Sequence, residues 1–322
     1  MSLWWLPAGL AGVVVAAIVV LLPGNERVLG WSQTWQPWRK ERPDEARRTA
    51  GFAAPKLTES SGVTVSRRLP GVLWTHNDGG NEPVLFATDT AGRALGQATL
   101  AGVHRNVDWE AVGVGACGEA EECLYLADTG DNQSERPFVT LYRVREPSSA
   151  RGSRTLAPVD SLRLRYAQGA HDLEAMLVAP GGDVLLIAKR FRGEVPYYRV
   201  PSEAWRGGRA DAGRPLTVTR AGTVPIDPTS AFGRWVTDAA MAPDGVHAAV
   251  RTYRDLYLFR LERGALVPAQ RPALCDIGGL ESQGEGVAWL DRRTLVLTSE
   301  RAFGSPGAIH VVRCPSFRVD DS

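Results

Sequence analysis

Acidic residues recur at one place in an internal repeat of the chain. Five segments begin with Asp or Glu, continue with small residues and enter an apolar run, at spacings of 47 to 64 residues. Converging like charges raise pKa values or cost free energy unless something compensates them. Ca²⁺ supplies such compensation, because it prefers six to eight oxygen ligands. The five acidic positions are Glu59, Glu110, Glu174, Asp238 and Glu285.

Further oxygen ligands accompany three of these positions. Asp108 precedes Glu110, Asp172 precedes Glu174 and Glu281 precedes Glu285, and the turn Asp128–Asn132 adds oxygens beside Glu110. Zinc is disfavoured, because histidines are few and no Cys/His cluster has ligand spacing. We predict a metal site with Ca²⁺ as the preferred ion, and its predicted ligands are Glu110, Asp128, Asp131, Glu174, Asp238 and Glu285.

A structural role is the alternative for each of these carboxylates. An inward carboxylate at a strand start can accept backbone N–H bonds from the neighbouring repeat and clamp the two together without any ligand. We favour this interpretation for Glu59 and Asp238. For Glu110, Glu174 and Glu285, metal binding and clamping stay equally open.

Basic residues near the ends of the second strands predict an anion site. Set against the acidic ring, they could hold an anionic ligand such as a phosphoester while a metal activates water. Salt bridges with the ring are the alternative, and a structural role is the alternative for the histidine. No Gly-x-Ser-x-Gly elbow is present, so the pattern assigns no catalytic residue and leaves enzymatic activity open. The predicted ligand-binding residues are His76, Asp78, Lys189, Arg190, Arg251 and Arg301.

The elements that must position these residues are short strands. Apolar runs recur between Gly, Pro, Asp and Asn clusters, and each acidic start is followed by a second and a third apolar run. Only the stretch 202–209 offers a helical turn. Repeats of this length fit four-stranded blades. We predict an all-β chain whose residues 55–316 form a β-propeller of about five four-stranded blades, with a sixth, degenerate blade over 201–235 as the alternative.

Several motifs resemble those of an uncharacterised bacterial family of secreted β-propellers. They are Leu73–Gly80, Asp108–Ala111, Asp128–Asn132, His171–Ala175 and Gly284–Gly286. That family is related in style to phytase-like and esterase-like propellers, and the resemblance implies a propeller fold. Phytase propellers carry calcium and phosphate-binding basic residues at the channel mouth. Their motif does not match residue by residue here, so the resemblance transfers no catalytic assignment.

The N-terminus predicts a membrane anchor. Residues 3–22 carry no charge and are long enough to cross the hydrocarbon core, and Trp4 and Trp5 suit an interfacial belt. We therefore predict a single-pass transmembrane helix over 1–23, with a cleaved signal as the alternative. A linker over 24–54 and a C-terminal tail over 317–322 complete the predicted organisation.

Cysteines and charge bear on the compartment. We predict disulfides Cys117–Cys123 and Cys275–Cys314, which persist only in oxidising compartments; four free thiols are the alternative. Basic residues after the apolar segment argue for the opposite orientation. We weight the cysteines more and predict an extracytoplasmic propeller on the cell membrane. The formal net charge of +1 disfavours nucleic acid as a partner. A ligand-binding propeller is the favoured function, and a metal-dependent, phytase-like phosphoester hydrolase is the alternative.

Overall fold

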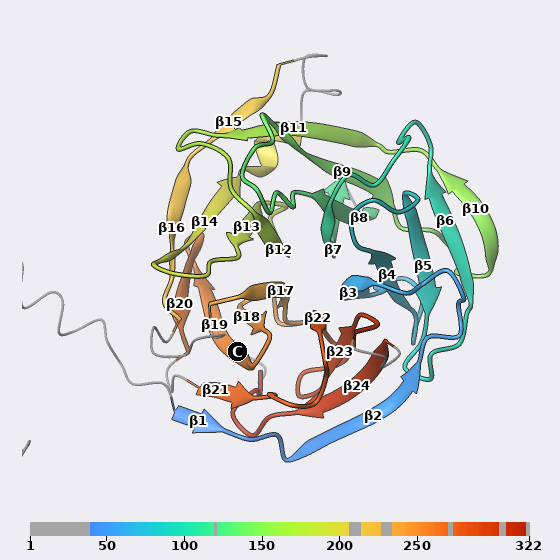
Figure 1. Cartoon of the computed structure of the whole chain (residues 1–322), viewed down its shortest axis with the longest axis vertical. Helices are drawn as coiled ribbons and strands as arrows, with labels where there is room; N and C mark the ends of the chain where they lie inside the picture. Colours follow the sequence, from blue (N-terminus) through green and yellow to red (C-terminus); the bar gives the residue numbers. More distant parts are fainter. Residues whose placement is uncertain are drawn as a thin grey trace, which may run out of the picture. The chain divides into compact units, whose positions relative to one another are not determined.

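The computed structural model describes residues 39–118, 121–205, 214–226, 234–269, 273–302 and 307–319, and these form five sheets around one centre (Figure 1). Each sheet is one blade of a β-propeller, and its strands follow one another outward from the centre. The five-bladed, all-β prediction is confirmed. The predicted membrane helix over 1–23 lies outside the described residues. Among the described residues, no helix has the length and apolarity that crossing a membrane requires.

The first three strands of every blade form an antiparallel meander. Blade 1 contains β3 (Ser60–Val65), β4 (Leu73–Asn77) and β5 (Val84–Thr88). Blade 2 contains β7 (Trp109–Gly118), β8 (Glu121–Asp128) and β9 (Val139–Arg145). Blade 3 contains β12 (Leu173–Val178), β13 (Val184–Ala188) and β14 (Val195–Val200). Blade 4 contains β17 (Val236–Met241), β18 (His247–Thr252) and β19 (Asp255–Glu262). Blade 5 contains β22 (Gly284–Trp289), β23 (Leu295–Ser299) and β24 (Ala308–Arg313).

The outer strands come from several parts of the chain. Blade 1 adds β6 (Gly96–Leu100) and β10 (Gly152–Leu156), and blade 2 adds β11 (Asp160–Tyr166) and β15 (Leu216–Val218). Blade 3 adds β16 (Arg220–Val224), and blade 4 adds β20 (Ala265–Pro268), β21 (Ala273–Asp276) and β1 (Arg39–Glu41). Blade 5 ends on β2 (Glu45–Gly51). The described part of 201–235 therefore supplies β15 and β16 to existing blades rather than a sixth blade.

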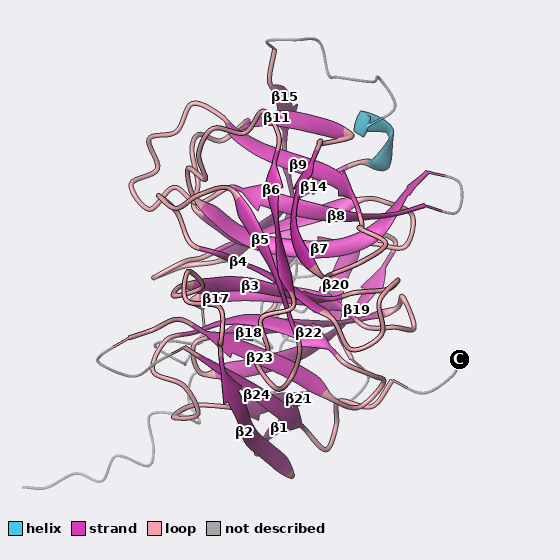
Figure 2. Ribbon diagram, turned by 90° about the vertical axis from the view of Figure 1, so that its right-hand side faces the viewer, coloured by secondary structure: helices cyan, strands magenta, loops and turns pink. Residues whose placement is uncertain are grey.

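The inner strands are apolar because both faces of a blade are covered by its neighbours. All residues of β12, β13 and β22 are buried, as expected for strands packed on two sides. Trp74 and Trp109 are fully buried in the core shared by blades 1 and 2. A short helix, η2 (Ser202–Trp205), is drawn in cyan in Figure 2, and its Trp205 packs edge-on against Tyr125 of β8.

The two ends of the chain meet in blades 4 and 5. β2 pairs antiparallel with β24, and β1 pairs parallel with β21. Residues 39–51 therefore belong to the propeller, and the predicted linker over 24–54 is wrong for this part. The predicted tail is wrong in the same way, because Phe317 and Val319 are buried in the core of blades 4 and 5. The Glu41 carboxylate accepts bonds from the backbone N–H and hydroxyl of Ser316, 2.9 and 2.7 Å away, and holds this end down.

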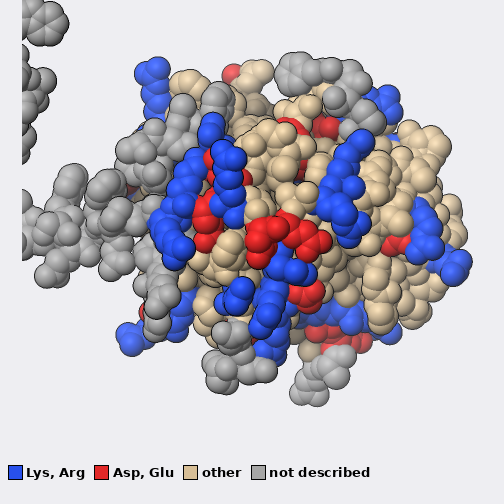
Figure 3. All heavy atoms as spheres, turned by 90° about the horizontal axis from the view of Figure 1, so that it is seen from below, with Lys and Arg blue, Asp and Glu red and all other residues tan. Residues whose placement is uncertain are grey.

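Opposite charges alternate on the side of the propeller that carries β1 and β2 (Figure 3). Ion pairs there join Lys40 to Asp276 and Arg313 to Glu45. Each pair lies in part in solvent, so its net contribution to stability is small. The pairs leave mixed charge rather than a field of one sign.

Both predicted disulfides are present. Cys117–Cys123 closes the hairpin between β7 and β8, whereas Cys275–Cys314 joins blade 4 to the end of blade 5. The two bonds span 6 and 39 residues of sequence. Because the second bond closes the longer loop and ties neighbouring blades, it restricts the unfolded chain more.

We expect the Cys275→Ser/Cys314→Ser variant to lose about 4 kcal/mol of unfolding free energy and the Cys117→Ser/Cys123→Ser variant about 2 kcal/mol, from loop-closure entropy. Urea unfolding of both variants beside the parent measures the difference. Equal losses, or the larger loss for the short loop, would contradict the larger stabilisation assigned to Cys275–Cys314.

Candidate functional site: an acidic channel mouth

A β-bulge occurs near the start of the innermost strand in every blade. There the register with the second strand shifts, so that one or two residues of the inner strand have no partner. Bulges of this kind redirect side chains and are common beside active sites. The bulged residues, taken in blade order, are Ser61, Glu110, Glu174, Thr237 and Glu285.

This register corrects the repeat inferred from sequence. Glu59 lies two residues before the bulge of blade 1, and Asp238 lies one residue after that of blade 4. Only Glu110, Glu174 and Glu285 therefore occupy equivalent positions. The five predicted carboxylates do not form one uniform ring.

Two groups of carboxylates meet at this end of the channel and share Glu110. One contains Asp78, Asp108 and Glu110, and the other contains Glu110, Asp172 and Glu174. Within each group the oxygens lie within 4.8 Å of one another. Ca²⁺ binds oxygen at 2.3–2.6 Å, so ligands on opposite sides of the ion are roughly 5 Å apart. The spacing and the all-oxygen donor set fit a hard divalent cation.

Burial and nearby carboxylates raise the pKa values of four of these groups, Asp78, Asp108, Glu110 and Glu174. Burial first, and then the Asp78 and Asp172 carboxylates, raise the pKa of Asp108 to about 6. Burial, followed by Glu174 and the neighbouring aspartates, raises the pKa of Glu110 well above its usual range. The pKa of Glu300 at the edge of the group rises to about 8 through burial and the nearby Glu285. Without a cation, these raised carboxyl groups therefore keep their protons to higher pH than isolated carboxyl groups do.

One ammonium group lies among these carboxylates in the described chain. Lys189 Nζ lies 3.0 Å from Glu174 Oε1 and 3.3 Å from the Tyr253 hydroxyl. That hydroxyl donates to Glu285 Oε1 at 3.0 Å, while Glu285 Oε2 is buried without a hydrogen-bond partner among the described residues. The resulting chain of polar contacts crosses blades 3, 4 and 5. The Lys189 charge also acts on Asp78, but burial outweighs it and the pKa of Asp78 stays raised.

The turn that follows β8 supports the acidic groups. Asp128 binds Arg136 at 2.7 Å and accepts the Asp108 backbone N–H at 3.1 Å. Asp131 accepts the backbone N–H groups of Glu135 and Arg136 at 2.8 and 2.9 Å. Both aspartates were predicted as metal ligands, but neither belongs to the two carboxylate groups, and these contacts occupy Oδ1 of Asp128 and both oxygens of Asp131. Their role is to position the turn.

Gly130 lets this turn approach the carboxylates. A Cβ at Gly130 would lie 2.1 Å from Glu110 Oε1 and 2.5 Å from Asp108 Oδ2, closer than atoms can pack. Any other residue would therefore have to displace both carboxylates. Because Gly130 has no side chain, the backbone of the turn can lie directly beside the Glu110 and Asp108 carboxylates.

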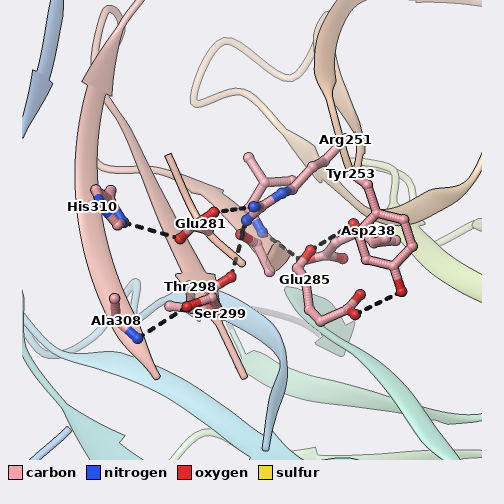
Figure 4. A network of polar contacts seen from close by, with 12 residues as sticks. Asp238, Arg251, Tyr253, Glu281, Glu285, Thr298, Ser299, Ala308 and His310 are labelled. Carbon is pink, nitrogen blue, oxygen red and sulfur yellow. Dashed lines mark hydrogen bonds and ion pairs between the residues drawn. The ribbon is translucent and has the colours of Figure 1, made fainter. Parts of the chain in front are cut away.

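Asp238 and Arg251 lie deeper and join blades (Figure 4). Asp238 accepts the backbone N–H groups of Ala239 and Val287, both at 2.8 Å, which places it in the clamping role rather than in a metal site. Arg251, predicted as a ligand-binding residue, is 1% exposed. It donates to Gly286 O and Thr298 O and pairs with Glu281.

Glu281 is likewise held away from the acidic groups. Its carboxylate pairs with Arg251 and lies 3.1 Å from His310 Nδ1 (Figure 4). Although burial alone would raise the pKa of Glu281, the adjoining Arg251 and His310 lower it below its usual range. The expected partnership of Glu281 with Glu285 is therefore wrong.

The remaining predicted residues divide between core and surface. His76 is fully buried, its Nδ1 bonds to Asn77 O, and burial lowers its pKa to about 4, so the ring is neutral and structural. Arg301 is exposed, and its backbone N–H donates to Thr58 O. Asp78 belongs to the acidic groups, and Arg190 lines the adjoining pocket. Of the predicted ligand set, Asp78, Lys189 and Arg190 come together.

The pocket beside the acidic groups has a volume of about 570 Å³. Asp172 and Lys189 lie on its lining together with Arg190, Phe191, Trp235 and Tyr253. Sequence reasoning missed Tyr253, Trp235 and Glu300. The strand register identifies their positions. Lys189, Tyr253 and Glu300 each follow the last residue of a second strand. Asp172 and Trp235 each lie two residues before a bulge.

No protein-family model matches the sequence, and no curated protein aligns with it significantly. Solved structures similar to this chain include a PQQ-bound aldose sugar dehydrogenase from Streptomyces coelicolor (12% identity, 85% of this chain, 100% of that chain, TM-score 0.47). They also include the allergen Mala s 1 of Malassezia sympodialis (12% identity, 83% and 95%, TM-score 0.49). At this sequence identity and TM-score, the similarity supports no inference about function. The propeller part of the resemblance drawn from sequence is confirmed by the five sheets, and its phytase-like part stays a prediction.

The raised pKa values predict how stability depends on pH when cations are removed. A carboxyl group with a pKa near 8 in the fold, as for Glu300, binds its proton more tightly in the folded than in the unfolded chain. It stabilises the fold at lower pH, and this contribution is lost as pH rises through about 8.

We therefore expect the melting temperature in chelator to fall between pH about 5 and about 8, and Glu300→Gln to reduce that fall. Melting curves of both proteins across this range provide the measurement. A melting temperature that rises through the window in the parent protein would show that these carboxyl groups are ionised at neutral pH.

Proposed function

We propose that this protein is an extracytoplasmic β-propeller, tethered to the membrane, that binds Ca²⁺ at its channel mouth together with a small anionic ligand. Asp78, Asp108, Glu110, Asp172 and Glu174 would hold the cation. The anion would lie in the adjoining pocket, where Arg190 and the cation both attract it.

The observation that carries the proposal is the sharing of Glu110 by two carboxylate groups. These groups come from β4, β7 and β12 and their flanking loops, so three blades contribute to one small region. Without a cation, protonation relieves part of their repulsion, as the raised pKa values of Asp108 and Glu110 indicate. A divalent cation would replace those protons and remove the repulsion.

We expect Ca²⁺ to bind the purified propeller and to raise its unfolding free energy, by about 2.7 kcal/mol at a hundredfold excess over Kd. Isothermal titration calorimetry and melting curves with and without chelator measure both effects. Gly130→Ala should weaken Ca²⁺ binding by about 10–100-fold, because it displaces two ligands without removing either. Glu110→Gln should weaken it at least as much.

Gly181→Ala is the matched control, because a Cβ there meets no atom within 4 Å. It should bind Ca²⁺ as the parent does. Absence of binding in the parent, with identical melting in chelator, would refute the cation site. Equal weakening in both alanine variants would refute the role given to Gly130.

A phosphoester hydrolase that resembles phytases is the second candidate. Lys189 and Arg190 beside the carboxylates favour it, because bound metal and basic residues together stabilise phosphoryl groups. The two candidates differ in turnover. Calcium-dependent hydrolysis of para-nitrophenyl phosphate that Glu110→Gln abolishes would establish the hydrolase. Binding of the phosphoester without hydrolysis would support the ligand-binding propeller.

The membrane tether rests on the uncharged residues 3–22 and the compartment on the two disulfides. We expect the full-length chain to remain in the membrane fraction after alkaline carbonate washing. A chain that begins at residue 38 behind a cleavable signal should appear in the soluble extracytoplasmic fraction instead. Release of the full-length chain by carbonate would exclude the anchor and favour a cleaved signal.

A further inference from the structure

An aromatic wall leads from the molecular surface to the acidic channel mouth. Phe191 and Trp235 have ring centroids 5.4 Å apart, and Trp235 meets Tyr253 edge-on at 5.7 Å. Tyr253 in turn lies against Lys189, whose Nζ is 5.2 Å from the ring centroid. Three rings from two blades therefore form one continuous surface along the pocket.

The outer end of this wall is unusually open. Phe191 is 65% exposed, the largest exposure among the large hydrophobic residues that the structure describes. A single exposed apolar side chain needs no explanation by itself. Here, however, the exposed ring continues a wall that lines a concave pocket of ligand size. A flat apolar surface in such a pocket favours contact with the face of a ring.

Guanidinium groups flank the same wall. Arg190 and Arg192 both line the pocket, and Arg192 lies over the Phe191 ring at 5.4 Å. Among the described residues, neither guanidinium forms an ion pair, in contrast to Lys189 with Glu174. Arginine favours phosphoryl and carboxylate groups because its planar fork makes paired hydrogen bonds. The pocket thus combines a ring surface with available positive charge.

We propose that this pocket is a subsite for a small organic anion that carries a ring, with its phosphoryl group between Arg190 and the bound cation and its ring against Phe191 and Trp235. The inference rests on the proposed cation site, because the cation supplies part of the attraction. The cation site alone would not distinguish a phosphorylated ring compound from free phosphate. The aromatic wall adds that distinction, because only the ring compound can contact it.

Phosphonates test this subsite without the complication of hydrolysis. Phenylphosphonate and cyclohexylphosphonate carry an aromatic and a saturated ring, and methylphosphonate carries the same charged group with none. We expect at least one ring-bearing probe to bind about tenfold more tightly than methylphosphonate in the presence of Ca²⁺, the size of a ring contact. The tighter of the two identifies the class of ring.

Phe191→Ala should remove most of this preference and leave methylphosphonate binding and Ca²⁺ binding unchanged. Because Phe191 is exposed, the variant should fold as the parent does. Arg190→Gln should weaken all three probes, and Val159→Ala, which removes an exposed apolar side chain elsewhere, should change none.

The outcomes separate the subsite from the cation site. Ca²⁺ binding with no preference for a ring, or a preference that survives Phe191→Ala, would overturn the subsite and leave the cation site intact. A ring preference that persists in chelator, in a protein that binds no Ca²⁺, would support the aromatic wall and overturn the cation site.

Discussion

Glu110 belongs to both groups of carboxylates at the channel mouth. Within each group the oxygens lie within 4.8 Å of one another, and Glu110 and Glu174 are buried. Charges so close repel strongly in a medium of low dielectric constant. A fold can carry such a cluster only if its strands cannot separate to relieve it. The remaining contacts of the channel are therefore best understood by how they keep the five blades together around this point.

Every junction between blades has a polar contact near the channel. Asn106 bonds Asn77 O across blades 1 and 2, and the Thr129 hydroxyl bonds Leu173 O across blades 2 and 3. Lys189 reaches Tyr253 across blades 3 and 4, and Asp238 accepts the Val287 N–H across blades 4 and 5. The backbones of Glu59 and Glu300 form an isolated antiparallel β-bridge between blades 1 and 5. With these contacts in place, repulsion among the carboxyl groups is relieved by protons or cations rather than by motion.

Sequence patterns predicted the propeller well because the repeated apolar strands are local features. The second and third strands of each blade appear where the apolar runs indicated, for example Val184–Ala188 and Val195–Val200. The strands β1 and β2 were missed because their residues are largely polar and because their pairing partners, β21 and β24, lie far away in the sequence.

The site was predicted less completely, for a physical reason. A bulge shifts which residue faces the channel by one position, and nothing in the local composition of Glu59 or Asp238 reveals that shift. Asp128 and Arg251 were assigned by type, whereas their contacts with Arg136 and Glu281 decide their roles. Glu110, Glu174 and Lys189 do lie together, because their positions in the repeat agree with the bulge register.

The pairing of β2 with β24 also sets the order in which the molecule can assemble. β2 is made early and its partner β24 is the last described strand, so this pair forms only after nearly the whole propeller has been synthesised. Folds dominated by such distant pairings fold slowly and leave strand edges exposed meanwhile. Until its final blade is made, the nascent chain would therefore leave strand edges unpaired, and the Cys275–Cys314 bond would form as one of the last steps of folding.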